Sequence, residues 1–353
     1  MVDALAEPGD RDGGSGPLAR EAAHFAALDL GTNNCRLLIA APAPRGYRVV
    51  DAFSRIVRLG EGLSQSGRLS EAAMERAISA LTICAEKIKR HGRVRVRAIA
   101  TQACRSASNG TEFLGRVAEM TGLKLKVISP REEARLSVAG CAELLDPQAA
   151  AALVLDVGGG STELSWLDLR QRRGRDGSPA IHAWLSIPTG VVTLAEQFPE
   201  TDGADDDWFR RMVEAVKSPI AAFEGPRPLR GHFEQGRAHL VGTSGAITSL
   251  AGLHLGLARY DRSKVDGLWM SRRECDAVAR HLATLTPAQR AAQPCVGPDR
   301  ADLVLAGAAI LQAVQEIWPC ERVRVADRGL REGVLLSLMN ERRRGGRRVR
   351  RRR

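Results

Sequence analysis

Apolar runs separated by amphipathic stretches define the elements expected in this chain. The pattern predicts strands at 25–30, 35–40 and 47–54, followed by an amphipathic helix at about 70–90 with Ser70 as its N-cap. Further strands are expected near 94–100, 124–128, 152–156, 181–187, 238–242 and 322–326, and further helices near 110–121, 131–145, 205–223, 271–283, 299–317 and 329–339 and directly after 189 and 245. Strands that alternate with helices predict α/β layers.

Two short segments, 27–34 and 155–162, read almost alike. Each ends an apolar run on an Asp, continues with small or hydroxylated residues, and leads into a second apolar run, which is typical of a β-hairpin with a Gly-rich turn. The two Asp residues, Asp29 and Asp156, lie about 127 residues apart. The repeat predicts two related half-domains that face each other across a phosphate-binding cleft.

The residue types in these turns suit an anion. Glycine allows backbone N–H groups to approach a phosphate closely, and Ser and Thr add hydroxyl donors. Asp29, Asp156 and Glu163, which stands on the opposite strand of the second hairpin, are candidate ligands of a divalent cation. Alternatively, Asp29 and Asp156 each brace only their own turn. The candidate phosphate-binding residues are Gly31, Thr32, Asn33, Asn34, Gly158, Gly159, Gly160, Ser161 and Thr162.

Composition indicates a chain of two domains without a membrane span. The 353 residues can form two cores, at 24–150 and 151–340, and no run of 18 apolar residues occurs. Residues 1–23 lack an apolar core segment, so a disordered extension is expected rather than a secretory signal. The seven cysteines are scattered without a C-x-x-C pair, which favours a reducing, cytoplasmic location over disulfides or structural zinc.

The net charge of +11 is concentrated at the C-terminus. Residues 341–353 carry nine Arg and one Glu, which leaves +3 for the other 340 residues. Such a tail can bind polyanions or, weakly, nucleic acid, or it can be a solvated disordered segment.

Six sequence blocks carry a resemblance to a known family. The two turns and the block 242–245 resemble the phosphate and base-side loops of the actin-like superfamily. With 100–105, 128–136 and 329–335, they resemble the exopolyphosphatase and guanosine pentaphosphate phosphohydrolase (Ppx/GppA) family over about 25–339. The resemblance implies an α/β fold of two actin-like (ribonuclease H-like) domains across a cleft. It also implies a short form without the further C-terminal HD-type domain, and a possible homodimer.

The resemblance also implies roles for particular residues. Arg105, with Asn109 after it, would contact phosphate, and one Glu of the block 132–135 would activate water. Glu133 is favoured over Glu132, although helix-dipole stabilisation alone would explain both. Pro130 and Arg131 depart from the family pattern, which leaves open which Glu faces the cleft. The block Gly242, Thr243, Ser244 and Gly245 would line the polyphosphate path or form a plain turn.

These observations favour an exopolyphosphatase that uses Mg²⁺, or another divalent cation such as Mn²⁺, and a Glu-activated water. The alternative within the family is a guanosine pentaphosphate 5'-phosphohydrolase, which would connect the protein to the stringent response. An actin-like ATPase or sugar kinase, and a polyanion binder that works through the tail, are more distant alternatives. Block 328–334 is expected to pack the last helix against the second domain, with Arg331 in a structural role.

Overall fold

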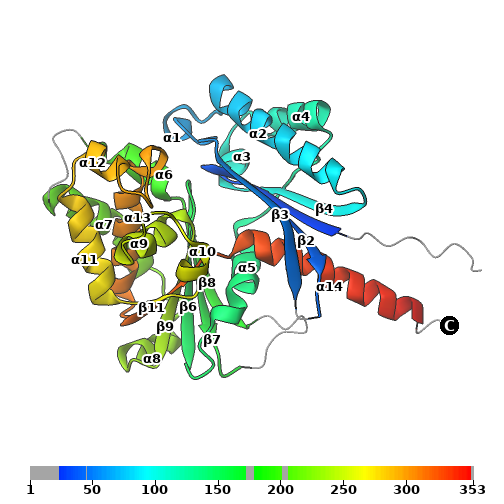
Figure 1. Ribbon diagram of the computed structural model, residues 1–353. Coiled ribbons are helices and arrows are strands. Elements are labelled where there is room, and N and C mark those ends of the chain that lie inside the picture. The colour runs from blue at the N-terminus through cyan, green and yellow to red at the C-terminus, as the bar shows by residue number, and fades with distance from the viewer. Residues whose placement is uncertain (1–23, 45, 172–178, 201–205, 351–353) are drawn as a thin grey trace, which may run out of the picture.

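The computed structural model describes residues 24–44, 46–171, 179–200 and 206–350, with backbone only at 206 and 342–350. Two sheets form two halves of the molecule (Figure 1). The expected N-terminal extension, most of the polar loop at 170–179 and most of the acidic loop at 202–207 lie outside the described residues.

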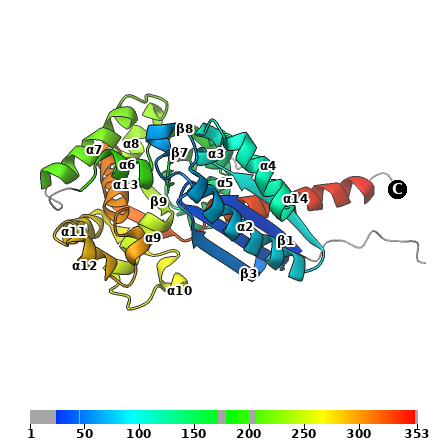
Figure 2. The same ribbon diagram turned by 90° about the horizontal axis from the view of Figure 1, so that it is seen from above.

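The first sheet is built from the N-terminal part of the chain. Its strands are β1 (His24–Leu30), β2 (Asn34–Pro42), β3 (Tyr47–Ile56), β4 (Val94–Ala100) and β5 (Lys126–Val127), in the order β3-β2-β1-β4-β5. The strands β1, β2 and β3 pair antiparallel, while β4 and β5 join parallel to them. Helices α2 (Glu71–Arg90) and α4 (Gly110–Thr121) cover one face (Figure 2). The Ser70 side chain caps α2 by accepting from Ala73 N–H, as predicted.

The second sheet repeats this topology. Its strands are β6 (Ala151–Val157), β7 (Thr162–Asp168), β8 (Ile181–Ile187), β9 (Ala238–Thr243), β10 (Trp269–Ser271) and β11 (Arg322–Ala326). The order β8-β7-β6-β9-β11 matches the order of the first sheet, with β10 added at the edge. The prediction of two related halves across a cleft is therefore confirmed.

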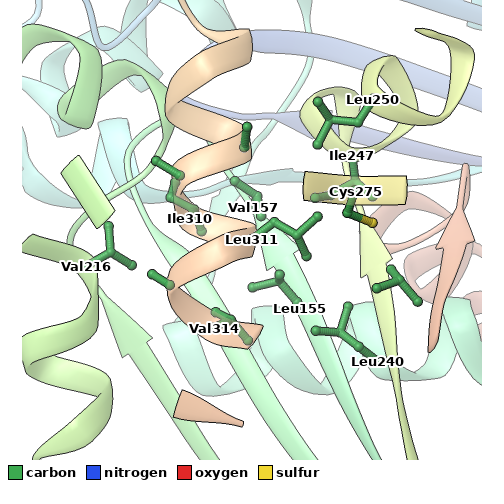
Figure 3. Packing of buried hydrophobic residues seen from close by; sticks show 14 of the residues in the cluster. Leu155, Val157, Val216, Leu240, Ile247, Leu250, Cys275, Ile310, Leu311 and Val314 are labelled. Atoms are coloured by element: carbon green, nitrogen blue, oxygen red, sulfur yellow. The ribbon is translucent and has the colours of Figure 1, made fainter. Parts of the chain in front are cut away.

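The larger core lies on one face of the second sheet. Helix α13 (Val304–Ile317) crosses this face, and Ile310 and Val314 pack over Leu155 and Leu240 (Figure 3). Longer helices that join it in this half are α6 (Val191–Gln197), α7 (Asp206–Ala221), α9 (Gly245–His254) and α11 (Arg272–Ala283). Alternate residues of the strands enter this core because side chains in a strand point to opposite faces.

Two helices are exchanged between the halves. Helix α5 (Pro130–Cys141) follows the first sheet but packs on the second, and α14 (Leu330–Arg350) follows the second sheet but packs on the first. They cross very closely, since a Cβ on Gly140 would lie 1.9 Å from the Gly329 carbonyl oxygen. Figure 1 shows this helix pair between the two sheets.

The position of α14 corrects one expectation. We expected the last helix to pack against the second domain, but Leu335 and Leu338 bury against Ala27 and Leu38 of the first sheet. The apolar periodicity of a helix indicates which face is buried, not which partner buries it. The helix also continues to Arg350, so the backbone of 341–350 is helical where a disordered tail was expected.

Several short elements were not predicted, because three to five residues are too few for a periodicity to be read. They are α1 (Leu63–Ser66), α3 (Gln102–Ser106), α8 (Arg230–Glu234), α10 (Arg262–Val265), α12 (Pro287–Ala291) and the 3₁₀ turn Arg227–Leu229. The 3₁₀ turns Ala142–Leu144 and Pro298–Arg300 lie at the end of the helix predicted near 131–145 and at the start of the one predicted near 299–317. Within the described part of the chain, no helix has the length and apolar character needed to cross a bilayer.

Candidate active site

The two predicted turns have the same backbone construction. In the first hairpin, Asp29 pairs with Arg36, and Gly31 N–H donates to the Asn34 carbonyl at 2.9 Å. In the second hairpin, Asp156 pairs with Glu163, and Gly158 N–H donates to the Ser161 carbonyl, also at 2.9 Å. Asp29 therefore corresponds to Asp156, and Arg36 corresponds to Glu163.

The turns meet face to face between the two halves. A Cβ placed on Gly159 would lie 3.0 Å from the Thr32 Cβ and 3.1 Å from the Asn33 Cβ. One on Gly160 would lie 2.9 Å from the Thr32 hydroxyl oxygen. Such distances leave no room for a side chain without displacement of the neighbour, so glycine allows the second turn to touch the first.

A pocket with about 1070 Å³ of empty space, part of it open to solvent, lies beside this contact. It collects most of the residues predicted from the sequence. Those that line it are Asp29, Gly31, Thr32, Asn33, Asn34, Glu133, Asp156, Gly158, Gly159, Gly160, Ser161, Glu163, Thr243, Ser244 and Gly245. Because they come from both halves, the pocket depends on how the halves are placed.

Four of the carboxyl groups that line the pocket interact electrostatically and form its acidic wall, namely those of Asp29, Glu133, Asp156 and Glu163. The Glu163 Oε1 accepts hydrogen bonds from the hydroxyls of Ser161 at 2.8 Å and Ser186 at 3.0 Å. Asp156 accepts a hydrogen bond from the Ser137 hydroxyl of α5. Among the described residues, the buried Oδ1 of Asp29 has no hydrogen-bond partner.

Burial perturbs all four groups in the same direction. Desolvation raises the pKa of Asp29 to about 6 and the pKa of Glu163 to about 7. It also raises the pKa of Asp156, and it raises the pKa of Glu133 well above its ordinary range. The negative charge of Asp156 adds to the shift of Glu163. A cation or bound protons would stabilise such a cluster.

The two adjacent glutamates of α5 point to different places. Glu133 is 7% exposed and lines the pocket. The Glu132 Oε1 instead accepts a hydrogen bond from Arg97 Nη2 of β4 at 2.5 Å, away from the pocket. The helix starts regularly despite Pro130, since Ser129 caps it by accepting from the Glu132 N–H at 3.2 Å. The residues before the helix therefore leave Glu133 facing inward.

Arg105 lies behind Glu133 rather than on the pocket wall. Its Nη1 donates to the Ile128 carbonyl at 2.8 Å and lies 3.3 Å from Glu133 Oε2, while Nη2 donates to Gln102 Oε1 at 2.6 Å. This positive charge opposes the upward pKa shift of Glu133. In this structure the guanidinium orients Glu133 and is occupied by protein partners.

Three candidate phosphate ligands are not brought to the pocket. The Asn109 side chain is buried and pairs with both backbone groups of Leu69, at 2.9 and 3.0 Å. The Thr162 hydroxyl donates to the Thr189 carbonyl at 2.7 Å, on the face of β7 opposite to Glu163. Gly242 is buried within β9. Thr162 and Gly242 adjoin pocket residues in sequence, but strand alternation turns them away.

The loop between β9 and α9 remains at the pocket. The Thr243 hydroxyl donates to the Arg328 carbonyl at 2.8 Å. Ser244 has a φ of 111°, a region that L-residues rarely adopt, and its buried hydroxyl has no partner among the described residues. A strained residue with an unpaired hydroxyl beside a pocket indicates a binding role.

Sequence reasoning missed the basic residues that line the pocket, which are Arg36, Arg300, Arg328 and Arg331. A Cβ on Gly245 would lie 3.6 Å from Arg36 Nη2 and 3.7 Å from Arg300 Cζ, so two guanidinium groups share this corner. A charged residue within the apolar run 35–40 was the available signal for Arg36. Arg331 was expected to be structural only. We call these arginines the basic wall of the pocket; it adjoins the acidic wall where Arg36 pairs with Asp29.

The fold and the pocket define a two-domain α/β protein of the actin-like class, with a site suited to a phosphate-rich anion. The chain belongs to the Ppx/GppA phosphatase family, which it matches over residues 38–342. It is similar to exopolyphosphatase 2 of Mycobacterium tuberculosis, with 32% identity over 329 residues that cover 89% of this chain and 98% of that protein.

Solved structures of the family share the fold. A member from Aquifex aeolicus is 29% identical, with a TM-score of 0.73 over 91% of this chain and 99% of that one. An exopolyphosphatase-like protein is also 29% identical, with a TM-score of 0.78 over 90% of this chain and 98% of that one.

Proposed function

We propose that this protein is an exopolyphosphatase that hydrolyses the terminal phosphate of inorganic polyphosphate. The observation that carries the proposal is the position of Glu133, a buried carboxyl group in the same pocket as both turns and the acidic cluster. The substrate class is supported by the similarity to a relative named exopolyphosphatase, which covers 89% of this chain. Polyphosphate is a linear polyanion, which suits a pocket with a basic wall.

The acidic wall fits a hard divalent cation such as Mg²⁺ or Mn²⁺. Its carboxyl groups are buried with raised pKa values, and one oxygen of Asp29 is unpaired among the described residues. Across those residues, no three His, Cys, Asp or Glu side chains form a direct metal cage. Mg²⁺ commonly uses one or two carboxylates with waters and substrate phosphates. Asp156 and Glu163, with Asp29 nearby, would hold it, and when bound it would neutralise phosphate charge.

Side chains and backbone groups of the protein would bind the substrate and activate the water. Backbone N–H groups of the two turns would hold the terminal phosphate, and Glu133 would accept a proton from a water aligned with the scissile bond. As the new P–O bond forms, the bridging P–O bond breaks and its electron pair stays on the shortened chain. Arg36, Arg300 and Arg331 would stabilise that developing charge. Arg105 would keep the Glu133 carboxylate oriented.

The deciding experiment measures phosphate release from polyphosphate with Mg²⁺ or EDTA. Glu133→Gln should lower kcat by about 10²–10⁴-fold, because removal of a general base has effects of this size. Glu132→Gln tests the rival base, and Glu119→Gln on the exposed side of α4 serves as the control. Full activity in Glu133→Gln contradicts the assigned base.

Other substrates separate the alternatives. Release from guanosine pentaphosphate alone would favour the 5'-phosphohydrolase, and turnover of ATP without release from polyphosphate would favour an ATPase or kinase. Deletion of 341–353 should leave hydrolysis in place, whereas a polyanion binder that works through the tail would lose its main activity.

A further inference from the structure

Each phosphate turn is held from behind by a second segment. In the first turn, the carbonyls of Asn33 and Thr32 accept hydrogen bonds from Val57 N–H at 2.8 Å and Gly60 N–H at 2.9 Å. We call 57–62 the first brace. It packs directly on the turn, because a Cβ on Gly60 would lie 2.2 Å from the Thr32 methyl carbon.

Helix α6 plays the same part for the second turn, and we call it the second brace. The carbonyls of Gly158 and Gly159 accept from Val191 N–H at 3.0 Å and Val192 N–H at 2.8 Å. A Cβ on Gly190, which precedes the helix, would lie 2.5 Å from the Gly158 carbonyl oxygen. Movement of either brace would therefore move its turn.

Two polar bridges lead from the segment of the first brace to the second half, one to the second brace and one to the residues around Arg300. Glu196 of α6 accepts from Gly62 N–H at 2.9 Å and from the Ser64 hydroxyl at 2.6 Å. Arg58 of the first brace donates to both oxygens of Asp302, at 3.0 and 3.1 Å, and to the Asp299 carbonyl at 3.1 Å. Asp299 and Asp302 flank Arg300, which lines the basic wall of the pocket.

The backbone of Arg58 is held in an unusual conformation. Its φ is 45°, and Ser244 is the other non-glycine residue with positive φ within the described ranges. The conformation is maintained by Arg58 N–H, which donates to the Asn33 carbonyl at 3.1 Å, and by its own carbonyl, which accepts from Arg76 Nη2 at 3.2 Å. Strain of this kind persists where the surroundings over-determine it, often at functional positions.

The bridges are not part of a hydrophobic core. Arg58, Glu196 and Asp302 line a cavity outside the active-site pocket. The apolar clusters of the two halves are separate. Partly exposed polar bonds are individually weak, so such a connection can open and close.

We propose that Arg58 and Glu196 are positioning residues that form a clamp across the cleft and set the distance between the two phosphate turns. Substrate held between both turns gains full affinity only when both bridges are closed. The inference rests on the proposed function, which supplies the substrate. It goes beyond that function because neither residue lines the active-site pocket.

The first test compares steady-state kinetics on a short polyphosphate. Arg58→Ala and Glu196→Ala should each raise KM about tenfold with a much smaller change in kcat, since site–site couplings in proteins are commonly 5–150-fold. Asp302→Asn is the conservative variant if Arg58→Ala folds poorly. Arg58→Ala and Asp302→Ala should be non-additive, because both remove one bridge.

Arg116→Ala is a matched control. Arg116 also makes a two-bonded pair with a carboxylate, Glu71, and its side chain is 33% exposed, as is that of Arg58. That pair lies within the first half and does not cross the cleft. An unchanged KM in Arg58→Ala and Glu196→Ala overturns the clamp, as does an equal rise in KM in Arg116→Ala.

A second readout does not depend on activity. Amide hydrogen exchange at 31–34 and 158–161 should be faster in Arg58→Ala and Glu196→Ala than in the unaltered protein and in Arg116→Ala. If the protein released no phosphate from polyphosphate, the proposed function would fail while faster exchange would still support the clamp. Unchanged exchange in both clamp variants contradicts it.

Discussion

The two hairpins share a backbone and differ in the charge that faces the pocket. In the first hairpin, Asp29 stands opposite Arg36, a cation that lowers its pKa against the effect of burial. In the second, Asp156 stands opposite Glu163, and the two carboxyl groups repel each other. One repeated fold therefore presents a carboxyl group with an arginine as its cross-strand partner in one half and two paired carboxyl groups in the other. We infer that the second hairpin is the better site for a cation and the first the better site for a substrate anion.

Within the two hairpins, the largest expected effect comes from the acidic pair of the second hairpin. Glu163→Gln should reduce kcat at a fixed Mg²⁺ concentration by about 10²–10³-fold, the range seen when one group that stabilises transition-state charge is removed. Asp29→Asn should reduce kcat less, because the positive charge of Arg36 already offsets the negative charge of that carboxylate. Mg²⁺ titrations of phosphate release compare the two variants. A larger loss in Asp29→Asn would reverse the assignment of the hairpins.

Substitution of Arg36 tests whether the first hairpin binds the substrate anion. Arg36→Gln should raise KM for polyphosphate by about 10–100-fold, since a hydrogen bond to a charged group contributes about 1.5–3 kcal/mol. The Mg²⁺ concentration for half-maximal activity should stay the same, because the acidic wall is intact. Initial rates over a matrix of substrate and Mg²⁺ separate the two effects. A shift in the Mg²⁺ requirement alone would contradict the anion role.

The contact between the turns distinguishes two glycines. Gly159→Ala should lower kcat/KM by about tenfold, because a new methyl group would push against Thr32 and Asn33 at the 1–3 kcal/mol level typical of overpacking. Gly31→Ala is the matched control, since its Cβ would meet its nearest neighbour, the Asn34 carbonyl oxygen, at 3.5 Å. The measurements are kcat/KM for polyphosphate hydrolysis and the thermal unfolding temperature of both variants. Equal losses would show that the turns tolerate separation.

The last comparison concerns the free energy of unfolding as a function of pH and not activity. A carboxyl with a raised pKa holds its proton more tightly in the folded than in the unfolded chain, so its contribution is present at low pH and is lost as the pH rises through the folded value. In EDTA, the free energy of unfolding should fall less with rising pH in both variants than in the unaltered protein. The difference should be complete near pH 6 for Asp29→Asn and near pH 7 for Glu163→Gln, the folded pKa values of the two groups. Urea unfolding from about pH 4 to 8 measures each change, which amounts to about 1.4 kcal/mol for each pH unit between the unfolded and the folded pKa. If the two variants gave the same pH dependence of unfolding, the proposed difference in charge between the hairpins would be contradicted.

Most regular elements could be predicted because their signals are local. The strands on each side of the two turns, the Ser70 cap and the long helices α2, α11 and α13 follow from periodicity over a few residues. The sheet against which α5 or α14 packs could not be predicted. Each helix follows one sheet and packs on the other, and an apolar stripe carries no information about which sheet will cover it.

The site shows the same division. Asp156 and Glu163 could be predicted because both adjoin a turn with an evident Gly-rich pattern. Thr162, next to Glu163, points away from the pocket, because the face that a strand residue takes depends on strand register. Asn109 was included through the resemblance, whereas the structure pairs it with Leu69. Arg36 was missed although it lies on the first hairpin, because strand register decides which face it takes. Arg300 was missed because it joins the pocket from a segment far away in the sequence.

By itself, the sequence determined the two hairpins, since an Asp, a Gly-rich turn and two apolar runs lie within about a dozen residues and need no distant partner. The tertiary structure alone decided that the turns touch through Gly159 and that Glu133 faces them. Glu133 lies on a helix that leaves the first sheet and packs on the second. Its distance from Asp156 and Glu163 is therefore set by helix packing between the halves, which no local pattern encodes.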